Sequence, residues 1–234
     1  LLNRPHGVLL LTGPTGSGKT TTLYASMSNL DSDSLKIITV EDPVEYQLKG
    51  INQIPVQSQI DLTFARALRS ILRQDPDIIM IGEMRDTETA HISVQAALTG
   101  HLVLSTLHTN TAAGAITRLE DMGVERFLIT AAVNGVLAQR LLRKLCPACK
   151  RLAKLDAEQM TRLGMTGEVP REAAVYEAVG CNQCKGTGYS GRSAIHELFV
   201  LDDEIQRAIL DGSDANQLRE AARAKGMATL YEDG

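Results

Sequence analysis

The chain has 234 residues, of which 44% are hydrophobic and 22% charged, and its formal net charge at pH 7 is −4. These proportions are typical of a folded globular protein and exclude an intrinsically disordered chain. Because the charge is negative and only 3% of the residues are aromatic, the composition also disfavours the basic, aromatic-lined groove of a nucleic-acid-binding protein.

The longest apolar stretch, FLITAAVNGVLA, predicts no membrane-spanning helix. It is interrupted by Asn134 and Gly135, and it is shorter than the roughly 18 residues that cross a bilayer. No signal peptide opens the sequence, which starts at Leu1 shortly before an apolar strand. We therefore expect a fragment of a longer, cytoplasmic protein.

Short apolar runs alternate with segments of helical period along the first part of the chain. The runs predict strands and the periodic segments predict helices. This alternation is typical of an α/β fold with a mostly parallel sheet covered on both faces. In chain order we expect strands over residues 7–12, 36–40, 77–82 and 102–108, and helices over residues 19–30, 64–74, 86–98 and 112–123.

The later part of the chain predicts further helices. A longer helix is expected from Phe127 to Leu145, because its basic end, RLLRKL, suits the negative end of a helix dipole. After a cysteine-bearing segment, a strand is expected over residues 194–201 and helices over 203–212 and 215–226. Gly212 and Gly226 are the predicted stop signals of these two helices.

The sequence GPTGSGKT, from Gly13 to Thr20, matches the phosphate-loop pattern G-x-x-x-x-G-K-[ST] between a predicted strand and a predicted helix. Its glycines allow successive backbone N–H groups to converge on phosphate oxygens at a helix N-terminus. Lys19 is expected to reach the β- and γ-phosphates of ATP, and the Thr20 hydroxyl to bind Mg²⁺. A glycine-rich connector without a ligand is the alternative. The predicted nucleotide-binding residues are Gly13, Pro14, Thr15, Gly16, Ser17, Gly18, Lys19, Thr20 and Thr21.

Two acidic clusters follow predicted strands. VEDPVEY contains Glu41, Asp42 and Glu45, and GEMRD contains Glu83 and Asp86. Hydrolysis of a phosphoanhydride needs one carboxylate near Mg²⁺ and another group that orients the attacking water. Acidic residues after a strand are also commonly turn residues or helix caps, and a cap is the simpler interpretation of the last of the five.

Histidines and arginines near these segments can be either functional or purely structural. His101 and His108 stand at the two ends of the predicted strand LVLSTL, where they would sense phosphate, bond the catalytic acids, or be structural. Arg66, Arg69 and Arg73 lie off the apolar face of the helix over 64–74, where they are either a solvated face or functional.

The four cysteines form two C-x-x-C pairs, CPAC at Cys146 and Cys149, and CNQC at Cys181 and Cys184. This spacing is typical of a structural zinc site with four thiolate ligands, which leaves no open coordination position for catalysis. Disulfide bonds are the poorer explanation in a reducing cytosol. Reduced structural thiols and a redox pair are the remaining alternatives.

Together these motifs resemble those of one family, the secretion-type ATPases that drive type II secretion and type IV pilus assembly. The resemblance covers essentially the whole chain, through GPTGSGKTTTLYA, TVEDPVEY, LRSILRQDPDIIMIGEMRD, TGHLVLSTLHTN, AQRL and the paired cysteines. It implies a RecA-like P-loop ATPase core over residues 1–145, a zinc-binding module over 146–190, and a C-terminal strand and helices over 191–234 that pack on the core.

The resemblance also implies roles for single residues. The phosphate loop is similar to a Walker A motif, Glu45 to the catalytic glutamate that positions water, and Glu83 to the Walker B acid near Mg²⁺. His101 and His108 match the histidines of the family's His box. Arginine positions that the family uses around the nucleotide or across subunit contacts are matched by Arg69, Arg73, Arg85, Arg118 and Arg192.

At the level of function, the resemblance implies a cytoplasmic motor that hydrolyses ATP to ADP and phosphate. The motor is a homohexamer that docks on inner-membrane platform proteins, mainly through an N-terminal domain outside this sequence, and so associates peripherally with the membrane. The segment SVQAALTGHLVLSTLHTNTAAGAITRL favours the type II secretion branch. The near alternative is a type IV pilus assembly ATPase, and the distant alternative is a nucleic-acid-dependent RecA-like ATPase.

Overall fold

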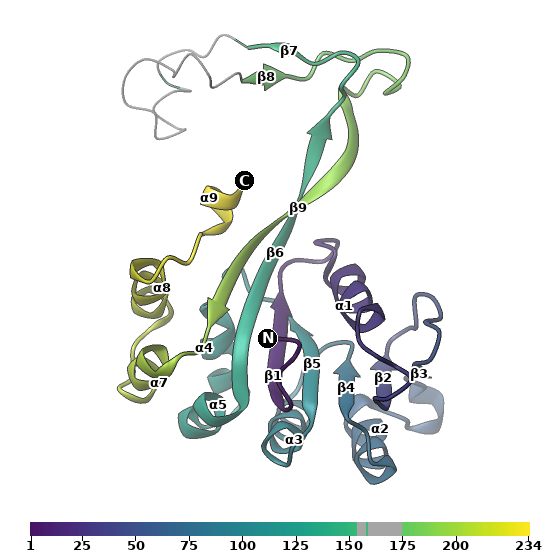
Figure 1. Ribbon diagram of the computed structural model, residues 1–234, viewed down its shortest axis with the longest axis vertical. Helices are drawn as coiled ribbons and strands as arrows, with labels where there is room; N and C mark the ends of the chain where they lie inside the picture. Colours follow the sequence, from purple (N-terminus) through teal and green to yellow (C-terminus); the bar gives the residue numbers. More distant parts are fainter. Residues whose placement is uncertain (154–157, 159–174) are drawn as a thin grey trace. The chain divides into compact units, whose positions relative to one another are not determined.

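The computed structural model describes residues 1–153, 158 and 175–234. The chain forms two compact units, one made of Leu1–Arg140 with Ala194–Gly234 and the other of Leu141–Ser193. Figure 1 follows the chain through both units.

The first unit is built on a mostly parallel sheet. Strand β1 (Gly7–Thr12) lies between β5 (Leu102–Leu107) and β6 (Val133–Leu145) and is parallel to both. Strand β4 (Ile78–Ile81) pairs with β5 and with β2 (Ile37–Glu41), again in parallel. The full order of the seven-stranded sheet is β3-β2-β4-β5-β1-β6-β9, with β3 over Asn52–Pro55 and β9 over Tyr189–Val200.

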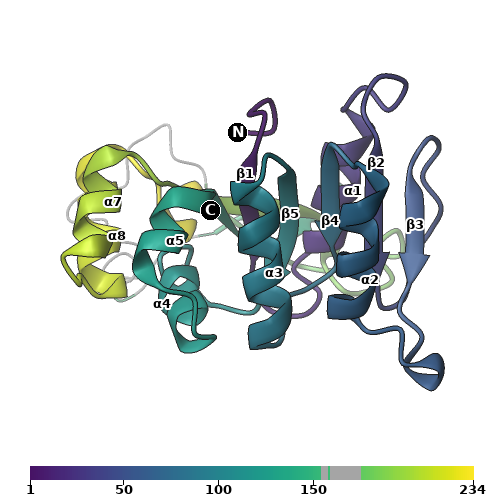
Figure 2. The same ribbon diagram turned by 90° about the horizontal axis from the view of Figure 1, so that it is seen from below.

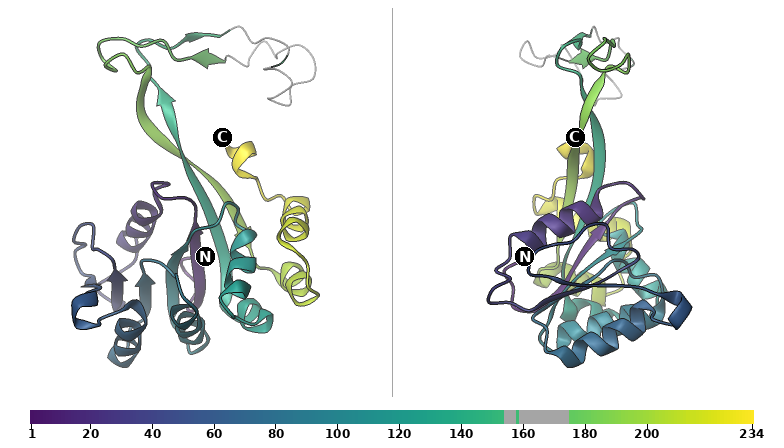
Figure 3. Two further views of the ribbon diagram at one scale, coloured as in Figure 1. Left: turned by 180° about the vertical axis from the view of Figure 1, so that it is seen from behind. Right: turned by 90° about the vertical axis from the view of Figure 1, so that its right-hand side faces the viewer.

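Helices cover both faces of the sheet because the central strands are apolar on both sides. Figure 3 shows α1 on one face and α2 and α3 on the other. Alternate side chains of β1 separate accordingly, since Leu9 and Leu11 pack with α1 whereas Val8 and Leu10 belong to the larger core on the opposite face. Each buried leucine contributes about 1.5–3 kcal/mol, and a one-residue slip would exchange the faces.

Six predicted helices, α1 to α4, α7 and α8, are confirmed close to their predicted positions, and Figure 2 shows the helices that cover the larger core. Gly212 and Gly226 follow two of them in left-handed backbone conformations, at φ +91° and +95°, as predicted for stop signals. The helices are α1 (Lys19–Ser28), α2 (Phe64–Ile71), α3 (Thr87–Leu98), α4 (Gly114–Asp121), α5 (Arg126–Ala132), α7 (Asp203–Leu210), α8 (Ala215–Ala224) and α9 (Leu230–Asp233), with short 3₁₀ turns η1 (Ser58–Ile60) and η2 (Leu72–Gln74).

The single helix predicted from Phe127 to Leu145 is wrong. The helix α5 ends at Ala132, and the chain continues as strand β6 beside β1. A side chain at Gly135 would come within 3.0 Å of the Phe199 carbonyl oxygen, so this position is shaped by the neighbouring strand β9. Sheet pairing outweighs local helix propensity here, because β6 satisfies backbone groups that β1 would otherwise leave open.

The second unit contains a short antiparallel pair, β7 (Arg151–Leu152) and β8 (Tyr176–Glu177), joined also by an Arg151–Glu177 ion pair of 2.6 Å. Much of the predicted module over 146–190, namely residues 154–157 and 159–174, lies outside the described residues. The two boundaries between the compact units fall inside β6 and β9, because these long strands run through both units. Among the described residues, no helix has the length and apolar character needed to cross a membrane.

Candidate nucleotide site and cysteine cluster

The phosphate loop connects the carboxyl end of β1 to the first residue of α1, as the motif predicts. Gly16 and Gly18 adopt left-handed conformations at φ +78° and +87°, which cost other residues about 1–2 kcal/mol. Gly13 is held even more tightly, since a Cβ atom there would lie 2.5 Å from the carbonyl oxygen of Gln139 and 2.7 Å from Ser17 Oγ. The loop backbone is therefore fixed in a shape that only this glycine pattern allows.

The loop residues fit a phosphate ligand. Ser17 is 3% exposed, and within the described part of the chain its hydroxyl oxygen has no hydrogen-bond partner. An unpaired buried polar group is costly unless a ligand or water satisfies it. Gly18, directly before α1, leaves the N-terminal N–H groups of that helix facing the loop. The donor set of the loop is thus that of an anion site.

Lys19 lies inside this loop. Its Nζ donates to the carbonyl oxygens of Gly13 at 2.8 Å and Pro14 at 3.1 Å. Burial lowers the pKa of Lys19; the negative charge of Glu83 opposes this shift, and the positive charge of Arg140 adds to it. The ammonium group therefore has a carboxylate and a second cation as neighbours.

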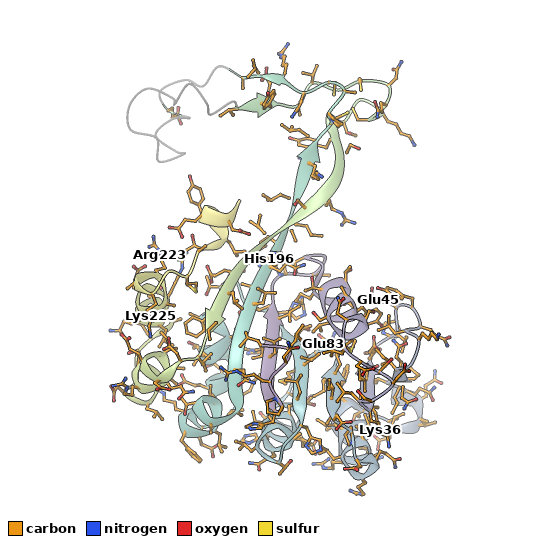
Figure 4. All side chains as sticks on the ribbon, in the orientation of Figure 1. Lys36, Glu45, Glu83, His196, Arg223 and Lys225 are labelled. Carbon is orange, nitrogen blue, oxygen red and sulfur yellow. The ribbon has the colours of Figure 1, made fainter. Side chains whose placement is uncertain are left out.

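Glu83 follows β4 at the same edge of the sheet, because β4 and β1 both run parallel to β5 and their carboxyl ends meet there. Its side chain is 12% exposed, forms an ion pair with Arg85, and has Oε2 3.5 Å from Nε2 of His108. The hydrogen bond and charge of Glu83 raise the pKa of Arg85. Figure 4 shows Glu83 between the strands of the sheet centre and the phosphate loop.

Glu45 lies in the loop that follows β2, and its side chain is exposed. Glu41, four residues earlier, is instead 2% exposed and is the last residue of the strand. The sequence offered both as acids of one cluster, but the structure separates an internal carboxylate from one that faces solvent. Asp86 is confirmed as the N-cap of α3, since its Oδ1 accepts from Thr89 N at 2.8 Å.

His101 lies at the other edge of the sheet. It precedes β5, whose first residue, Leu102, pairs with Gly7 at the start of β1. Its Nδ1 is 2.8 Å from the carbonyl oxygen of Ala96 in α3; a carbonyl only accepts, so Nδ1 carries the hydrogen. The structure thus brings His108, but not His101, to the phosphate-loop edge within this unit.

The predicted arginines are also distributed. Arg69 of α2 forms an ion pair with Glu88 of α3. Arg73, in the 3₁₀ turn η2, donates from Nη1 to the Arg69 carbonyl oxygen at 3.3 Å. Among the described residues, Arg85 is the one predicted arginine that contacts a predicted catalytic acid, Glu83. Arg118 is exposed on α4, and Arg192 belongs to the second unit.

Strand β6 contributes two residues to the site that were not predicted. Gln139 is 1% exposed; its Nε2 donates to the Ser17 carbonyl at 2.8 Å and its Oε1 accepts from the Thr22 hydroxyl at 2.8 Å. Arg140 Nη2 donates to the Asn110 carbonyl at 2.8 Å, and its Nη1 lies 3.0 Å from the position of a Cβ on Gly13. The quoted motif AQRL was the only sequence signal for them.

Thr12, the last residue of β1, ties the phosphate loop to the loop after β5. Its hydroxyl is 2.6 Å from Thr109 Oγ1 and accepts from Thr109 N at 2.8 Å. This contact places the residue after His108 directly beside the start of the phosphate loop. Nothing in a single threonine signals such a role in the sequence.

The cysteines of the second unit converge as predicted. The Sγ atoms of Cys146, Cys149, Cys181 and Cys184 all lie within 4.8 Å of one another. Backbone N–H groups of Cys181 and Gly188 each donate to Cys184 Sγ at 3.1 Å, and chiefly these lower the pKa of Cys184 to about 6. Thiolate-directed N–H groups around four converging sulfurs fit a tetrahedral zinc ion.

The mostly parallel sheet, the phosphate loop after β1 and the carboxylate that follows β4 define a P-loop nucleotide-binding protein with a RecA-like core. A family model described as "Type II/IV secretion system protein" matches residues 1–234. The chain therefore belongs to this family, as the sequence motifs predicted.

Named relatives come from both branches of the family. The type II secretion system protein HxcR of Pseudomonas aeruginosa is 58% identical over 234 residues, which cover all of this chain and 46% of that protein. The type II secretion system ATPase E of Vibrio cholerae is 54% identical, again over all of this chain and 46% of the relative. The type IV pilus assembly ATPase PilB of Thermus thermophilus is 56% identical over all of this chain and 26% of its own length. The chain thus spans about half or less of these relatives.

A solved structure supports the fold. The crystal structure of the pilus retraction motor PilT with bound ADP is similar at a TM-score of 0.65 and 32% identity, covering 99% of this chain and 61% of that one. The Legionella pneumophila ATPase DotB gives the same TM-score at 24% identity, which shows likeness of fold alone. The predicted α/β, RecA-like class is confirmed.

Proposed function

We propose that the protein is a magnesium-dependent ATPase that powers type II protein secretion by assembling a pseudopilus. One observation carries the proposal: Lys19, Glu83 and His108 come from three different segments and meet at the phosphate-loop edge of the sheet. Membership of the type II/IV secretion family and relatives named as secretion proteins support the biological setting.

The proposed chemistry uses this chain's residues in separate roles. The loop N–H groups and Lys19 bind and orient the β- and γ-phosphates, and Thr20 with Glu83 would hold Mg²⁺, which neutralises charge on the phosphates when it is bound. Glu45 orients the attacking water and accepts its proton. His108 restrains Glu83 through the contact of 3.5 Å. His101 lies at the opposite edge of the sheet, so we propose that it does not contact the phosphates bound at the phosphate loop of its own compact unit.

Assembly belongs to the proposal as well. We place the active protein in a homohexamer in the cytoplasm, held at the inner membrane by platform proteins that bind mainly through chain beyond these residues. Exposed arginines at predicted family positions are candidates for contacts with the nucleotide or with a neighbouring subunit: Arg69, Arg73, Arg85, Arg118 and Arg192. If subunits complete one another's sites, specific activity should rise with protein concentration.

The four-cysteine cluster is proposed to bind one structural Zn²⁺ per chain. Cys146, Cys149, Cys181 and Cys184 would supply all four ligands, so the ion stabilises the module between residues 146 and 190 and takes no part in hydrolysis. The proposed domains are the ATPase core over 1–145, this module, and the C-terminal portion over 191–234. Elemental analysis of freshly purified, reduced protein should find zinc at one equivalent.

The decisive measurement is phosphate release by the full-length protein with Mg²⁺ and ATP. Lys19→Ala and Glu83→Gln should each lower kcat about 100-fold or more, because each removes a charge placed at the transferred phosphoryl group. Lys36→Ala, at a lysine whose Nζ donates to the carbonyl of Gln74, is the matched control and should stay within about twofold of the parent. Unchanged turnover in both site variants would refute the catalytic assignment.

Type IV pilus assembly is a second candidate, because PilB of Thermus thermophilus is 56% identical to this chain. The two functions differ in the assembled fibre and not in the hydrolytic site. The gene should therefore be expressed in two hosts, one lacking its type II secretion ATPase and one lacking its pilus assembly ATPase. Restored export of a secreted enzyme in the first host supports type II secretion, and restored surface pili in the second supports the alternative.

A further inference from the structure

Tyr24 is a fully buried tyrosine in α1, five positions after Lys19. Its exposed fraction is 0%, and it lies in the core between α1 and the sheet. A buried phenol needs a hydrogen-bond partner. The hydroxyl of Tyr24 donates to Oε2 of Glu41, the buried carboxylate at the end of β2. Burial, and next this hydrogen bond, raise the pKa of Tyr24, so the hydroxyl remains a donor at neutral pH.

Glu41 is held by further donors. Its Oε1 accepts from the Thr39 hydroxyl at 2.5 Å and from Gln53 Nε2 at 3.1 Å. Thr39 and Glu41 are both odd-numbered residues of β2, like Ile37, which packs in the α1-facing core, so strand periodicity directs all three to α1. The carboxylate thereby joins three separate elements: α1, β2 and β3.

This network reaches the loop that carries Glu45. The backbone N–H of Glu45 donates to the Tyr24 hydroxyl oxygen at 3.3 Å. Gln53 Nε2 lies 3.1 Å from the carbonyl oxygen of Tyr46, and the Tyr24 and Tyr46 rings pack edge to face with centroids 4.6 Å apart. The loop has no regular secondary structure at Glu45, so these contacts anchor it at Glu45 itself and at the next residue.

We propose that Tyr24 is a positioning residue that fixes Glu45 relative to the phosphate loop through its shared hydrogen bonds with Glu41. Tyr24 and Lys19 lie on the same ten-residue helix, α1. The hydrogen bond from the backbone of Glu45 to Tyr24 therefore ties Glu45 to the helix that begins at the phosphate loop. Figure 4 shows Glu45 close to this helix. The proposal rests on the proposed ATPase function, in which Glu45 orients the attacking water.

The experiment compares Tyr24→Phe, Glu45→Gln and the double variant in the full-length protein, with kcat for phosphate release and the affinity for a fluorescent ATP analogue as readouts. The phenylalanine keeps the ring and removes only the hydroxyl. We expect kcat to fall about tenfold or more, because small displacements of a positioned group cost large factors in rate. Nucleotide affinity should stay within about twofold, since the phosphate loop itself is unchanged.

The double variant separates positioning from general structural support. If Tyr24 acts through Glu45, adding Tyr24→Phe to Glu45→Gln should change the residual rate by less than about twofold. A full, multiplicative loss in that background would overturn the proposal. Unchanged kcat in Tyr24→Phe would also overturn it while leaving the ATPase assignment intact, whereas unchanged kcat in Glu45→Gln would instead remove the catalytic role of Glu45.

Two further variants guard against loss of stability as the explanation. Phe199→Leu truncates a fully buried residue in the larger core on the opposite face and should lower the thermal midpoint while kcat stays within about twofold of the parent. Gln53→Leu removes the second anchor of the loop and should reproduce the kcat loss of Tyr24→Phe. If Phe199→Leu lowered kcat as much as Tyr24→Phe, the positioning role would be refuted.

Discussion

The phosphate-loop edge and the cysteine cluster are held together in opposite ways. At the phosphate loop, Ser17 and Gln139 meet although they are 122 residues apart in the chain, because a packed parallel sheet brings β6 beside β1. In the cysteine cluster, each pair lies within a short turn, and the two turns, represented by Cys149 and Cys184, are 35 residues apart. Among its described residues, the second unit has only the ends of β6 and β9 and the short antiparallel pair β7/β8 as strands.

This difference teaches where each site obtains its stability. The nucleotide site is built on a core that is buried on both faces of a sheet, so its geometry exists before a ligand binds. The converging sulfurs belong to a unit none of whose described residues lies in either apolar core cluster of the structure, so a bound metal would contribute much of its folding energy.

Removal of the proposed zinc ion should unfold the cysteine region and spare the parallel sheet. Structural zinc contributes about 10–16 kcal/mol of binding free energy. After chelation, the amides of Gly186 and Cys146, which donate to Cys181 O and Gly188 O at 2.9 Å, should lose hydrogen-exchange protection by several orders of magnitude. Amides of β1 should keep theirs, and added zinc should reverse the loss. Equal loss in both regions, or none in either, would contradict the contrast.

Glycine substitutions test how rigidly the sheet holds the phosphate loop. Gly13→Ala would place a Cβ 2.5 Å from the carbonyl oxygen of Gln139, at a residue with φ +150°. We expect the free energy of unfolding to fall by about 3 kcal/mol or more, together with a large loss of nucleotide affinity. Gly16→Ala is the matched control, since its φ of +78° is similarly unfavourable but its surroundings are open, and about 1–2 kcal/mol is expected. Denaturant unfolding and nucleotide titration measure both, and equal costs would show that the neighbouring strand does not constrain the loop.

The smallest effect concerns the contact between β6 and the loop. Gln139→Leu removes the donor to the Ser17 carbonyl and the acceptor for the Thr22 hydroxyl, and should cost about 1–3 kcal/mol of stability with a several-fold loss of nucleotide affinity. Thr22→Val removes only the second bond and should cost less than half as much. The double variant should resemble Gln139→Leu alone. Additive costs would mean that the two bonds do not form one unit.

Local motifs were predictable because short segments contain all of their determinants. The phosphate loop needs a strand, eight motif residues and a helix, and the N-cap at Asp86 needs only the first turn of α3. The predicted helix from Phe127 to Leu145 failed because the open edge of β1, more than a hundred residues earlier in the chain, decides that β6 is a strand. His101 shows a related limit: the sequence placed it at a strand end, but strand direction decided which edge of the sheet it occupies.

The sequence by itself determined the family, the phosphate loop with Lys19, the candidate acids and the four cysteines, because spacing along the chain encodes each of these. Only the tertiary structure decided which side chains share an edge of the sheet. It brought His108 to Glu83 and Glu83 to the neighbourhood of Lys19, kept His101 at the opposite edge, and placed Gln139 and Tyr24 in contact with the loops of the site. The physical reason is that parallel pairing fixes strand order, direction and facing together, and residues with no motif of their own acquire roles from the neighbours that this pairing gives them.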